Sequence, residues 1–330
     1  MKVPLTMDIA RESWAYKRPF RVSRGAEAAL DVIVVTLTDA AGHAGRGEAA
    51  GVDYDGETID LLARQLVELR SEVEAGLDRA ALAARLPPGG ARNALDCALW
   101  DLEAKRAGRR AWQLAGFGTA RALTSCVTLG LDTDAATAAG AHAYRDWPVL
   151  KVKVDAMRHL EVLRLVRAAA PTPSLIVDPN QSWTCALLNR LAPELERLGV
   201  VLVEQPVARG EDLSLRDYRG RIRLAADESA VDRRSLGNLQ DIYQVVNIKL
   251  DKSGGLTEAL ALAREALRRK FAVMVGCMAG TSLAMAPGMV VGQLAEFIDL
   301  DGPLLHSADR AAGIEYSRGT MQLPAAALWG

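Results

Sequence analysis

The sequence has little of what marks several classes of protein. Forty Lys and Arg residues are balanced by 41 Asp and Glu residues, which leaves a formal charge of −1. Because there is no excess of basic residues, neither a nucleic acid nor an anionic membrane is predicted as a partner. The four cysteines lie far apart, without the spacing of a metal site, so we expect buried free thiols in a reducing compartment. They are Cys97, Cys126, Cys185 and Cys277.

Targeting and membrane-spanning segments are also lacking. Residues 1–20 contain acidic and basic side chains at short intervals and no signal-peptide apolar run, so we expect a cytoplasmic protein. The uncharged run 271–295 is long enough to cross a bilayer. Glycines and Pro287 interrupt it, which favours a buried strand followed by a short buried helix.

What is present is the composition of a globular chain of considerable size. Half of the 330 residues are apolar and a quarter are charged. This length suits one large barrel or a barrel with an added domain.

The N-terminal third has its own pattern. The β-branched run 31–38 and the segment 44–48 predict a hairpin. Two amphipathic helices are predicted over 58–74 and 91–106. We therefore expect an α+β capping domain over residues 1–118, with residues 306–330 packing back on it.

From about residue 119 to 305 the pattern becomes one of short β-rich runs separated by helical stretches. Such alternation predicts an α/β fold, a (β/α)7β TIM-like barrel. A doubly wound sheet is the alternative, but no glycine-rich dinucleotide fingerprint follows any run. The runs cover 123–129, 149–154, 174–177, 200–203, 222–225, 244–248, 271–275 and 296–300.

Acidic residues stand at the ends of three successive runs. Asp178, Glu204 and Asp227 each follow an apolar stretch. In a barrel these ends meet at one mouth, where such folds place their active sites. Although a single acid could merely cap the next helix, three in register supply the hard oxygen ligands that suit Mg²⁺.

Lysines stand at the corresponding position before and after these acids. Lys151 and Lys153 share one face of the run 149–154, which on its own would fit a solvated surface strand. Lys249 ends the sixth run. In a barrel, Lys153 and Lys249 would lie on opposite sides of the metal, so that a carbon acid bound there would present one face to each. Lys151 could contact a substrate carboxylate oxygen.

These motifs resemble those of the enolase superfamily, and specifically its muconate-lactonizing-enzyme-like subgroup. They occur in order as Lys151-Val-Lys153, Asp178-Pro-Asn-Gln, Glu204-Gln-Pro, Asp227-Glu-Ser and Asn247-Ile-Lys249-Leu-Asp-Lys-Ser-Gly-Gly. The resemblance covers nearly the whole chain. It implies two acid–base lysines working beside a Mg²⁺ ion.

Within the subgroup, the chain is most similar to dipeptide epimerases. In that family a pair of acids on the eighth strand holds the free α-ammonium group, and Asp299-Leu-Asp301-Gly-Pro matches this motif. The implied reaction inverts the α-carbon of the C-terminal residue of a dipeptide, with L-Ala-D/L-Glu as the candidate substrate. Cys126 occupies the first strand, where relatives carry a threonine near the substrate.

The cap loops leave the choice of substrate side chain open. In Ala-Glu epimerases an arginine of the first loop pairs with the glutamate side chain, and Arg24 is the candidate. An alignment from Phe20 could equally place Gly25 or Glu27 there. Glu27, together with Asp53 and Asp55, would favour a cationic or polar residue instead.

Other functions fit the same framework. An o-succinylbenzoate synthase or an N-succinylamino-acid racemase would use the same lysines and metal but needs no ammonium site. A cycloisomerase is disfavoured because it too has no use for the acid pair Asp299 and Asp301. A non-catalytic barrel that only binds a ligand would not exchange the α-proton of any substrate with solvent. A small-molecule substrate is expected in each catalytic case, and the sequence leaves homo-oligomer formation open.

Overall fold

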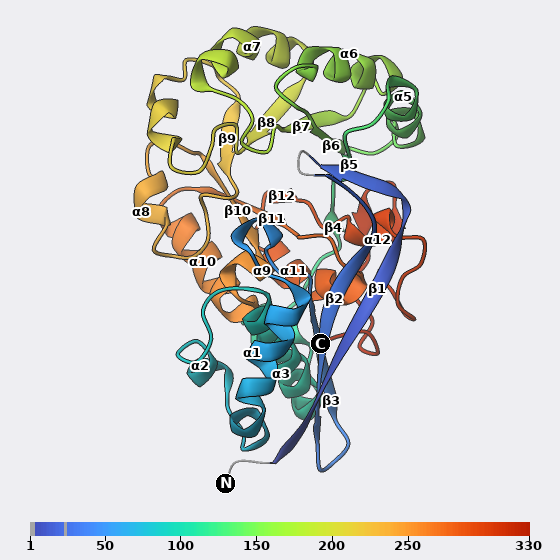
Figure 1. Ribbon diagram of the computed structural model, residues 1–330, viewed down its shortest axis with the longest axis vertical. Coiled ribbons are helices and arrows are strands. Elements are labelled where there is room, and N and C mark those ends of the chain that lie inside the picture. Colours follow the sequence, from blue (N-terminus) through green and yellow to red (C-terminus); the bar gives the residue numbers. More distant parts are fainter. Residues whose placement is uncertain (1–3, 23–24) are drawn as a thin grey trace.

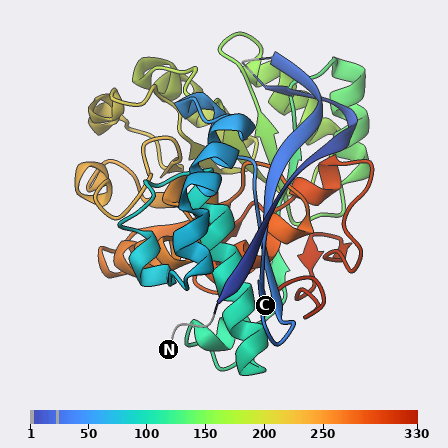
Figure 2. The same ribbon diagram turned by 60° about the horizontal axis from the view of Figure 1, so that its bottom comes forward.

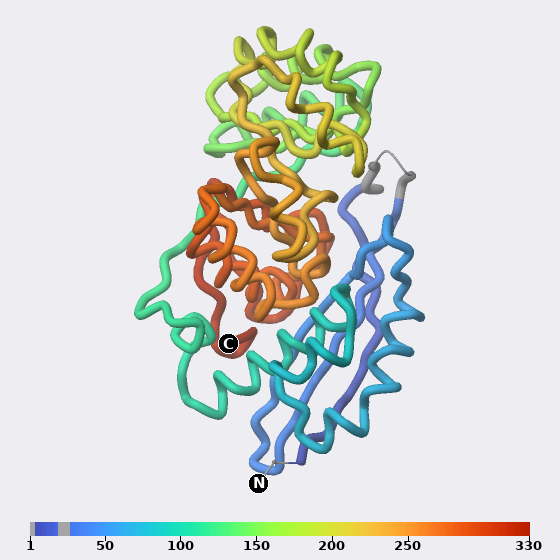
Figure 3. The backbone as a smooth tube through the Cα atoms, turned by 90° about the vertical axis from the view of Figure 1, so that its left-hand side faces the viewer, coloured from blue at the N-terminus to red at the C-terminus, as the bar shows by residue number. Residues whose placement is uncertain are grey.

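The computed structural model describes residues 4–22 and 25–330, with side chains outside 19–26. A ring of parallel strands surrounded by helices forms one part of the molecule, and a long antiparallel sheet with its own helices lies beside it (Figure 1). The predicted α/β barrel with an α+β cap is confirmed. The side view shows the blue cap strands running obliquely past the orange and red part of the barrel (Figure 3).

The cap sheet consists of three antiparallel strands in chain order. They are β1 (Leu5–Val22), β2 (Gly25–Asp39) and β3 (Ala44–Ala49). β2 and β3 form the predicted hairpin, in a register that pairs Thr38 with Ala44. β1, which pairs along β2 from Leu5 opposite Asp39 onward, was not predicted.

The cap helices match the two predicted ones to within a residue at each end. They are α1 (Ile59–Glu74) and α3 (Gly90–Ala107), with the short η1 (Asp53–Asp55), α2 (Arg79–Leu82) and α4 (Ala111–Leu114). Helix α3 packs directly on β3, because a Cβ atom at Gly47 would lie only 2.1 Å from the Ala94 carbonyl oxygen. Figure 2 shows the blue and teal helices beside the long blue strands.

The barrel contains eight strands whose order in the sheet follows the chain. Their pairings are parallel. The ring is completed where the Cys126 backbone N–H donates to the Ile298 carbonyl oxygen at 2.9 Å. The strands are β5 (Val127–Leu129), β6 (Val149–Lys153), β7 (Ser174–Asp178), β8 (Val200–Glu204), β9 (Arg223–Ala226), β10 (Val245–Lys249), β11 (Ala272–Gly276) and β12 (Phe297–Ile298).

The first predicted barrel run, 123–129, is wrong as a single strand. β4 (Leu123–Thr124) pairs antiparallel with β14 (Thr320–Met321), in a small sheet that also contains β13 (Tyr316–Ser317). Only the part from Val127 onward joins the barrel, so the chain changes pairing partner across Ser125 and Cys126.

Helices follow most barrel strands and cover the ring from outside. They are α5 (Asp134–Ala143), α6 (His159–Ala169), α7 (Cys185–Arg197), α8 (Leu236–Leu239), α9 (Leu250–Ser253), α10 (Leu256–Arg268), α11 (Ser282–Gly292) and α12 (Gly302–Leu305), and the 3₁₀ segment η2 (Asp212–Asp217) follows β8. The uncharged run 271–295 forms β11 and the buried α11, as predicted. Over the described residues, no helix combines the length and apolar character that a bilayer crossing requires.

The C-terminal segment contacts the cap helices as well as the barrel. Trp329 is buried, its indole N–H donates to the Cys97 carbonyl oxygen at 3.2 Å, and the Gly330 backbone N–H donates to Asp101 Oδ1 at 2.6 Å. The Ile314 backbone N–H donates to Ser282 Oγ of the barrel at 2.8 Å. The domain boundary between residues 118 and 119 stays a prediction.

Candidate active site

The carboxyl ends of five successive barrel strands bring the predicted polar residues to one mouth. Lys153, Asp178, Glu204 and Lys249 are the last residues of β6, β7, β8 and β10, and Asp227 directly follows β9. Because these strands are consecutive neighbours in the sheet, their ends lie side by side.

Lys151 lies at the centre of the carboxylates. Its ammonium nitrogen is 2.8 Å from Glu204 Oε2, 3.2 Å from Asp178 Oδ2 and 2.8 Å from Asp299 Oδ2. Burial disfavours the ammonium form, but the Asp299, Glu204 and Asp178 carboxylates outweigh burial and raise the pKa of Lys151 well above its usual value. Lys151 is therefore a fixed positive charge that joins the predicted metal ligands to the acids of the eighth strand.

Lys153 and Lys249 lie on opposite sides of the acidic cluster. Lys153 Nζ is 3.1 Å from Asp178 Oδ2 and donates to Asn180 Oδ1 at 2.8 Å. Lys249 Nζ donates to Asp227 Oδ2 at 2.8 Å. Although burial disfavours its charged form, contact with Asp227 raises the pKa of Lys249 well above its usual value. Strands β7 to β9 separate the two lysines.

The three predicted metal ligands are buried carboxylates with different electrostatic surroundings. Despite burial, the neighbouring lysines lower the pKa of Asp178 and of Asp227. Burial, with Asp178 and Asp227 nearby, raises the pKa of Glu204 to about 8 despite the neighbouring Lys151. Glu204 Oε2 makes no hydrogen bond with the described residues, although Lys151 lies 2.8 Å away. A hard divalent cation would satisfy this oxygen and these charges, so the donor set fits Mg²⁺.

The present side-chain arrangement is that of carboxylates paired with lysines. Over residues 4–22 and 25–330, no three His, Cys, Asp or Glu side chains are arranged around a common point as metal ligands. Asp227 Oδ2 faces Lys249, and Asp178 Oδ2 faces both Lys151 and Lys153. Joint coordination of one ion therefore requires these side chains to turn from the lysines.

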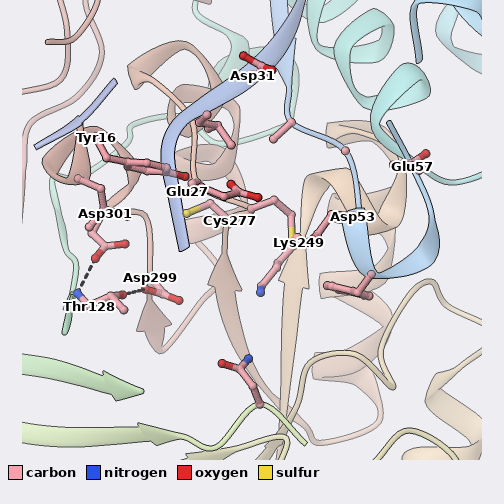
Figure 4. A pocket seen from close by; sticks show the side chains of 18 of the residues that line it. Tyr16, Glu27, Asp31, Asp53, Glu57, Thr128, Lys249, Cys277, Asp299 and Asp301 are labelled. Carbon is pink, nitrogen blue, oxygen red and sulfur yellow. Dashed lines mark hydrogen bonds between the residues drawn. The ribbon is translucent and has the colours of Figure 1, made fainter. Parts of the chain in front are cut away.

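Asp299 and Asp301 lie beyond the end of β12, at the edge of the same cavity (Figure 4). Asp299 Oδ2 accepts from Lys151 at 2.8 Å, so one of its oxygens is already occupied. Asp301 Oδ2 accepts from the Thr128 backbone N–H at 2.5 Å. Burial and the adjacent Asp299 raise the pKa of Asp301 to about 7, and a cation bound beside this carboxylate would oppose that rise.

The role of Cys126 in substrate binding stays a prediction. Its buried thiol lies behind Asp299, with Sγ 3.1 Å from Asp299 Oδ1, and it is not among the residues that line the cavity. Thr128, two residues further along, lines the cavity instead. Both side chains approach the same oxygen, since Thr128 Oγ1 lies 3.5 Å from Asp299 Oδ1.

The cap supplies the remaining wall of the cavity, which has a volume of about 390 Å³. Glu27, Asp53 and Tyr54, from the segments expected to form the cap loops, line it. Tyr16 of β1, which was not predicted, also lines it. Asp55 points away and pairs with Arg209 of the barrel at 2.6 Å. The prediction for Arg24 lies outside the described residues.

Two family models match the chain. Residues 5–116 match the mandelate racemase / muconate lactonizing enzyme N-terminal domain, and residues 133–327 match the enolase C-terminal domain-like family. The chain belongs to the enolase superfamily. This confirms the family inferred from the strand-end motifs.

Several members of the superfamily resemble the chain over nearly its whole length. The L-Ala-D/L-Glu epimerase of Escherichia coli K12 is 36% identical over 96% of this chain and 99% of its own. The N-acetyl-D-glutamate racemase of a Pseudoalteromonas species is 39% identical over 91% of this chain and 95% of its own. Both names denote isomerases that act on amino-acid derivatives.

Solved structures of superfamily members show the same fold. A member from Agrobacterium tumefaciens, with homology to dipeptide epimerases and with bound sodium and L-Ala-L-Glu, has a TM-score of 0.95 and 39% identity, covering 99% of this chain and 100% of its own. A dipeptide epimerase from Methylococcus capsulatus, complexed with Mg and L-Arg-D-Lys, has a TM-score of 0.90 and 29% identity, covering 98% and 97%.

The structure also places at the site three polar residues that the sequence reasoning assigned no role. Lys252 is buried, contacts the Asp227 carbonyl oxygen, and donates to Asp227 Oδ1 at 2.6 Å. Asn247 Nδ2 donates to Glu204 Oε1 at 2.8 Å, and Glu228 lines the cavity with one buried oxygen that makes no hydrogen bond with the described residues. All three lie within the motifs listed in the sequence analysis, so their place in those motifs could have indicated that they belong to the site.

With these residues included, the mouth carries more negative than positive side chains. Six carboxylates face four lysines, so a divalent cation would balance the charge when all are ionised. The carboxylates are Asp178, Glu204, Asp227, Glu228, Asp299 and Asp301, and the lysines are Lys151, Lys153, Lys249 and Lys252.

Proposed function

We propose that the protein is a Mg²⁺-dependent dipeptide epimerase that inverts the α-carbon of the C-terminal residue. The observation that carries this proposal is the placement of Lys153 and Lys249 on opposite sides of the buried carboxylates. The similarity to named epimerases over nearly the whole chain supports it. L-Ala-D/L-Glu is the first candidate substrate, since relatives named or solved with this dipeptide share 36% and 39% of their residues with the chain.

In this mechanism Asp178, Glu204 and Asp227 hold the metal. When bound, Mg²⁺ supplies positive charge beside the substrate carboxylate, where negative charge develops as the α-proton leaves. Lys151, already held among these carboxylates, contributes a second fixed positive charge. Both charges favour the transition state over the bound substrate, because the substrate carboxylate gains further negative charge as the α-proton leaves.

The two lysines carry the proton transfer. The amine nitrogen of one lysine takes the α-proton, and the electron pair of the broken C–H bond moves toward the carboxylate. The ammonium group of the other lysine then donates a proton to the opposite face of the carbon, which inverts it. A lysine that acts as the base must first be a free amine, so its contact with Asp178 or Asp227 has to be released.

Asp301 and Asp299 are proposed to bind the free α-ammonium of the dipeptide. Because Asp299 already pairs with Lys151, Asp301 is the carboxylate that gains most from a new cation. Thr128 orients Asp301 through its backbone N–H. We propose Arg24 for the acidic side chain of an Ala-Glu substrate. Glu27 and Asp53 line the cavity and would disfavour other acidic groups near them.

Isotope uptake tests the proposal directly. We expect the protein with Mg²⁺ in D₂O to introduce one deuterium at the α-carbon of the C-terminal residue of L-Ala-L-Glu, because the proton is returned from a lysine that exchanges with solvent. Mass spectrometry, with chiral separation of the products, measures uptake and inversion across a library of L,L-dipeptides. Absence of uptake from every dipeptide would remove the epimerase proposal.

An N-acylamino-acid racemase is the second candidate, because an N-acetyl-D-glutamate racemase is 39% identical to the chain. Such a substrate carries no α-ammonium group and needs the lysines and metal but not an ammonium site. The same isotope experiment, with deuterium uptake at the α-carbon of N-acetyl-L-glutamate as the measurement, tests this second function.

Asp301→Asn separates the two candidates. We expect this nearly isosteric change to lower kcat/KM for a dipeptide roughly 10²-fold, because it removes a buried carboxylate from the ammonium. Turnover of N-acetyl-L-glutamate should change little. Steady-state kinetics on both substrates check this, and an equal loss on both would argue against an ammonium site at Asp301.

A further inference from the structure

The cap segment 51–57 forms part of the cavity wall, on the side of the barrel mouth where β10 ends. Asp53 and Tyr54, in η1, line the cavity together with Lys249 and Asp227. Glycines in the left-handed region stand near both ends of this segment, Gly51 at φ 82° and Gly56 at φ 84°. Since glycine adopts this conformation without strain, the chain can turn sharply at both positions.

Hydrogen bonds hold the two ends of the segment, Gly51, Val52 and Glu57, separately from its tip, residues 53–55. The Gly51 backbone N–H donates to the buried Asp251 Oδ1 of α9 at 2.9 Å. The Val52 N–H donates to Glu57 Oε2 at 2.8 Å, and the same oxygen accepts from the Gly90 N–H at 2.9 Å. These contacts fix where the segment starts and ends but leave the position of its tip to other contacts.

A barrel residue contacts the tip. Arg209 Nη2 lies 2.6 Å from Asp55 Oδ1, and its guanidinium carbon lies 5.8 Å from the centroid of the Tyr54 ring. Arg209 belongs to the loop after β8, the strand that ends in Glu204. Its backbone N–H donates at 2.9 Å to Gln181 Oε1, on the loop after β7.

Tyr54 lies within electrostatic reach of the reacting groups on the β10 side. Burial and the Asp227 carboxylate raise the pKa of the Tyr54 hydroxyl, and the Lys249 ammonium opposes this rise. Tyr54 and Lys249 line the same cavity, so the Tyr54 ring forms part of the wall on the Lys249 side.

We infer that Arg209 is a positioning residue for the reaction, which holds the tip of segment 51–57 on the barrel so that Tyr54 closes the cavity beside Lys249. The inference rests on the proposed function, because it assigns a role in binding the same substrate. Arg209 touches no reacting atom. Its ion pair with Asp55 instead connects the loops that follow Asp178 and Glu204 to the cap.

The expected effect is on binding rather than on chemistry. Both partners are about two-fifths exposed, and exposed ion pairs contribute modestly, so Arg209→Ala should raise KM for L-Ala-L-Glu roughly two- to fivefold with kcat unchanged. Asp55→Ala should have the same effect, and the double variant should be no worse than either single variant, because both remove one contact.

Hydrogen exchange provides a readout that does not depend on turnover. In the full-length protein, backbone amides of residues 53–57 should exchange faster in Arg209→Ala than in the unmodified chain, while those of α1 should not change. The control is Arg223→Ala, which breaks an exposed ion pair with Glu296 at 2.6 Å. Arg223 is the first residue of β9 and therefore lies at the end of the strand away from the mouth.

Two results would overturn the inference. One is unchanged exchange at residues 53–57 in Arg209→Ala, and the other is additive KM effects of the two single substitutions. If the unmodified protein turns over no dipeptide at all, the proposed function fails, but the exchange measurement still decides whether Arg209 holds the segment.

Discussion

Lys153→Ala and Lys249→Ala are each expected to lower the rate of epimerisation by roughly 10²- to 10⁴-fold, the range that one positioned acid–base group supplies. Each variant removes the group that serves one face of the α-carbon, so inversion fails in both directions. Each should still exchange the α-proton of the one stereoisomer whose proton faces the remaining lysine. Separate deuterium uptake by the two stereoisomers in D₂O distinguishes these cases.

Lys105→Ala is the matched control for this pair of variants. Lys105 also pairs with a carboxylate, Asp101 Oδ2 at 2.8 Å, but it lies on α3 of the cap, away from the cavity. Its activity should equal that of the unmodified protein. If Lys153→Ala or Lys249→Ala inverts a dipeptide within tenfold of the unmodified rate, or if both lose exchange of the same stereoisomer, the two-lysine mechanism is wrong.

Glu204→Gln is expected to weaken Mg²⁺ binding by at least roughly 10- to 100-fold and to remove activity at ordinary metal concentrations. The substitution keeps the shape and the acceptor for Asn247 Nδ2 but removes one of three negative charges. Calorimetric titration with Mg²⁺ measures the affinity directly. Treating the unmodified protein with a chelator should likewise stop turnover, and added Mg²⁺ should restore it.

Thermal unfolding of the same variant separates a lost ligand from a damaged fold. Without metal, Glu204 is a buried carboxylate beside Asp178 and Asp227, so a neutral glutamine should not lower the Tm. With Mg²⁺, the Tm of the unmodified protein should rise and that of Glu204→Gln should not. Glu258→Gln, outside the cavity, serves as control. Equal Mg²⁺ stabilisation of both proteins would exclude Glu204 as a ligand.

The positions of the main polar residues were predictable because the barrel repeats one pattern. A β-rich run that ends in a polar residue, followed by a helix, places that residue at the mouth each time. The sequence alone was therefore enough to assign Asp178, Glu204 and Lys249 to one end of the ring. The pairing of Asp178 and Glu204 with Lys151 depends on side-chain directions, which the pattern does not contain.

Three features could not be predicted, each for a local reason. β1 carries charged residues along an edge strand, so its apolar alternation is weak. The surroundings of the Cys126 thiol could not be predicted because the chain leaves one sheet and enters another on either side of it. Lys252 reaches Asp227 because α9 begins directly after β10, and its single turn brings the side chain back over the mouth.

Buried carboxylates make several of the contacts between cap and barrel, and this limits how such proteins can be recombined. Glu48 of β3 binds Thr281 and Arg310, and Asp96 of α3 accepts from Thr257 at 2.6 Å. A chimera that lacks the Arg310 partner of Glu48 would leave this buried carboxylate without its ion pair, at a cost of about 3–5 kcal/mol. New substrate preferences are therefore easier to reach by exchanging loop residues than by exchanging whole modules.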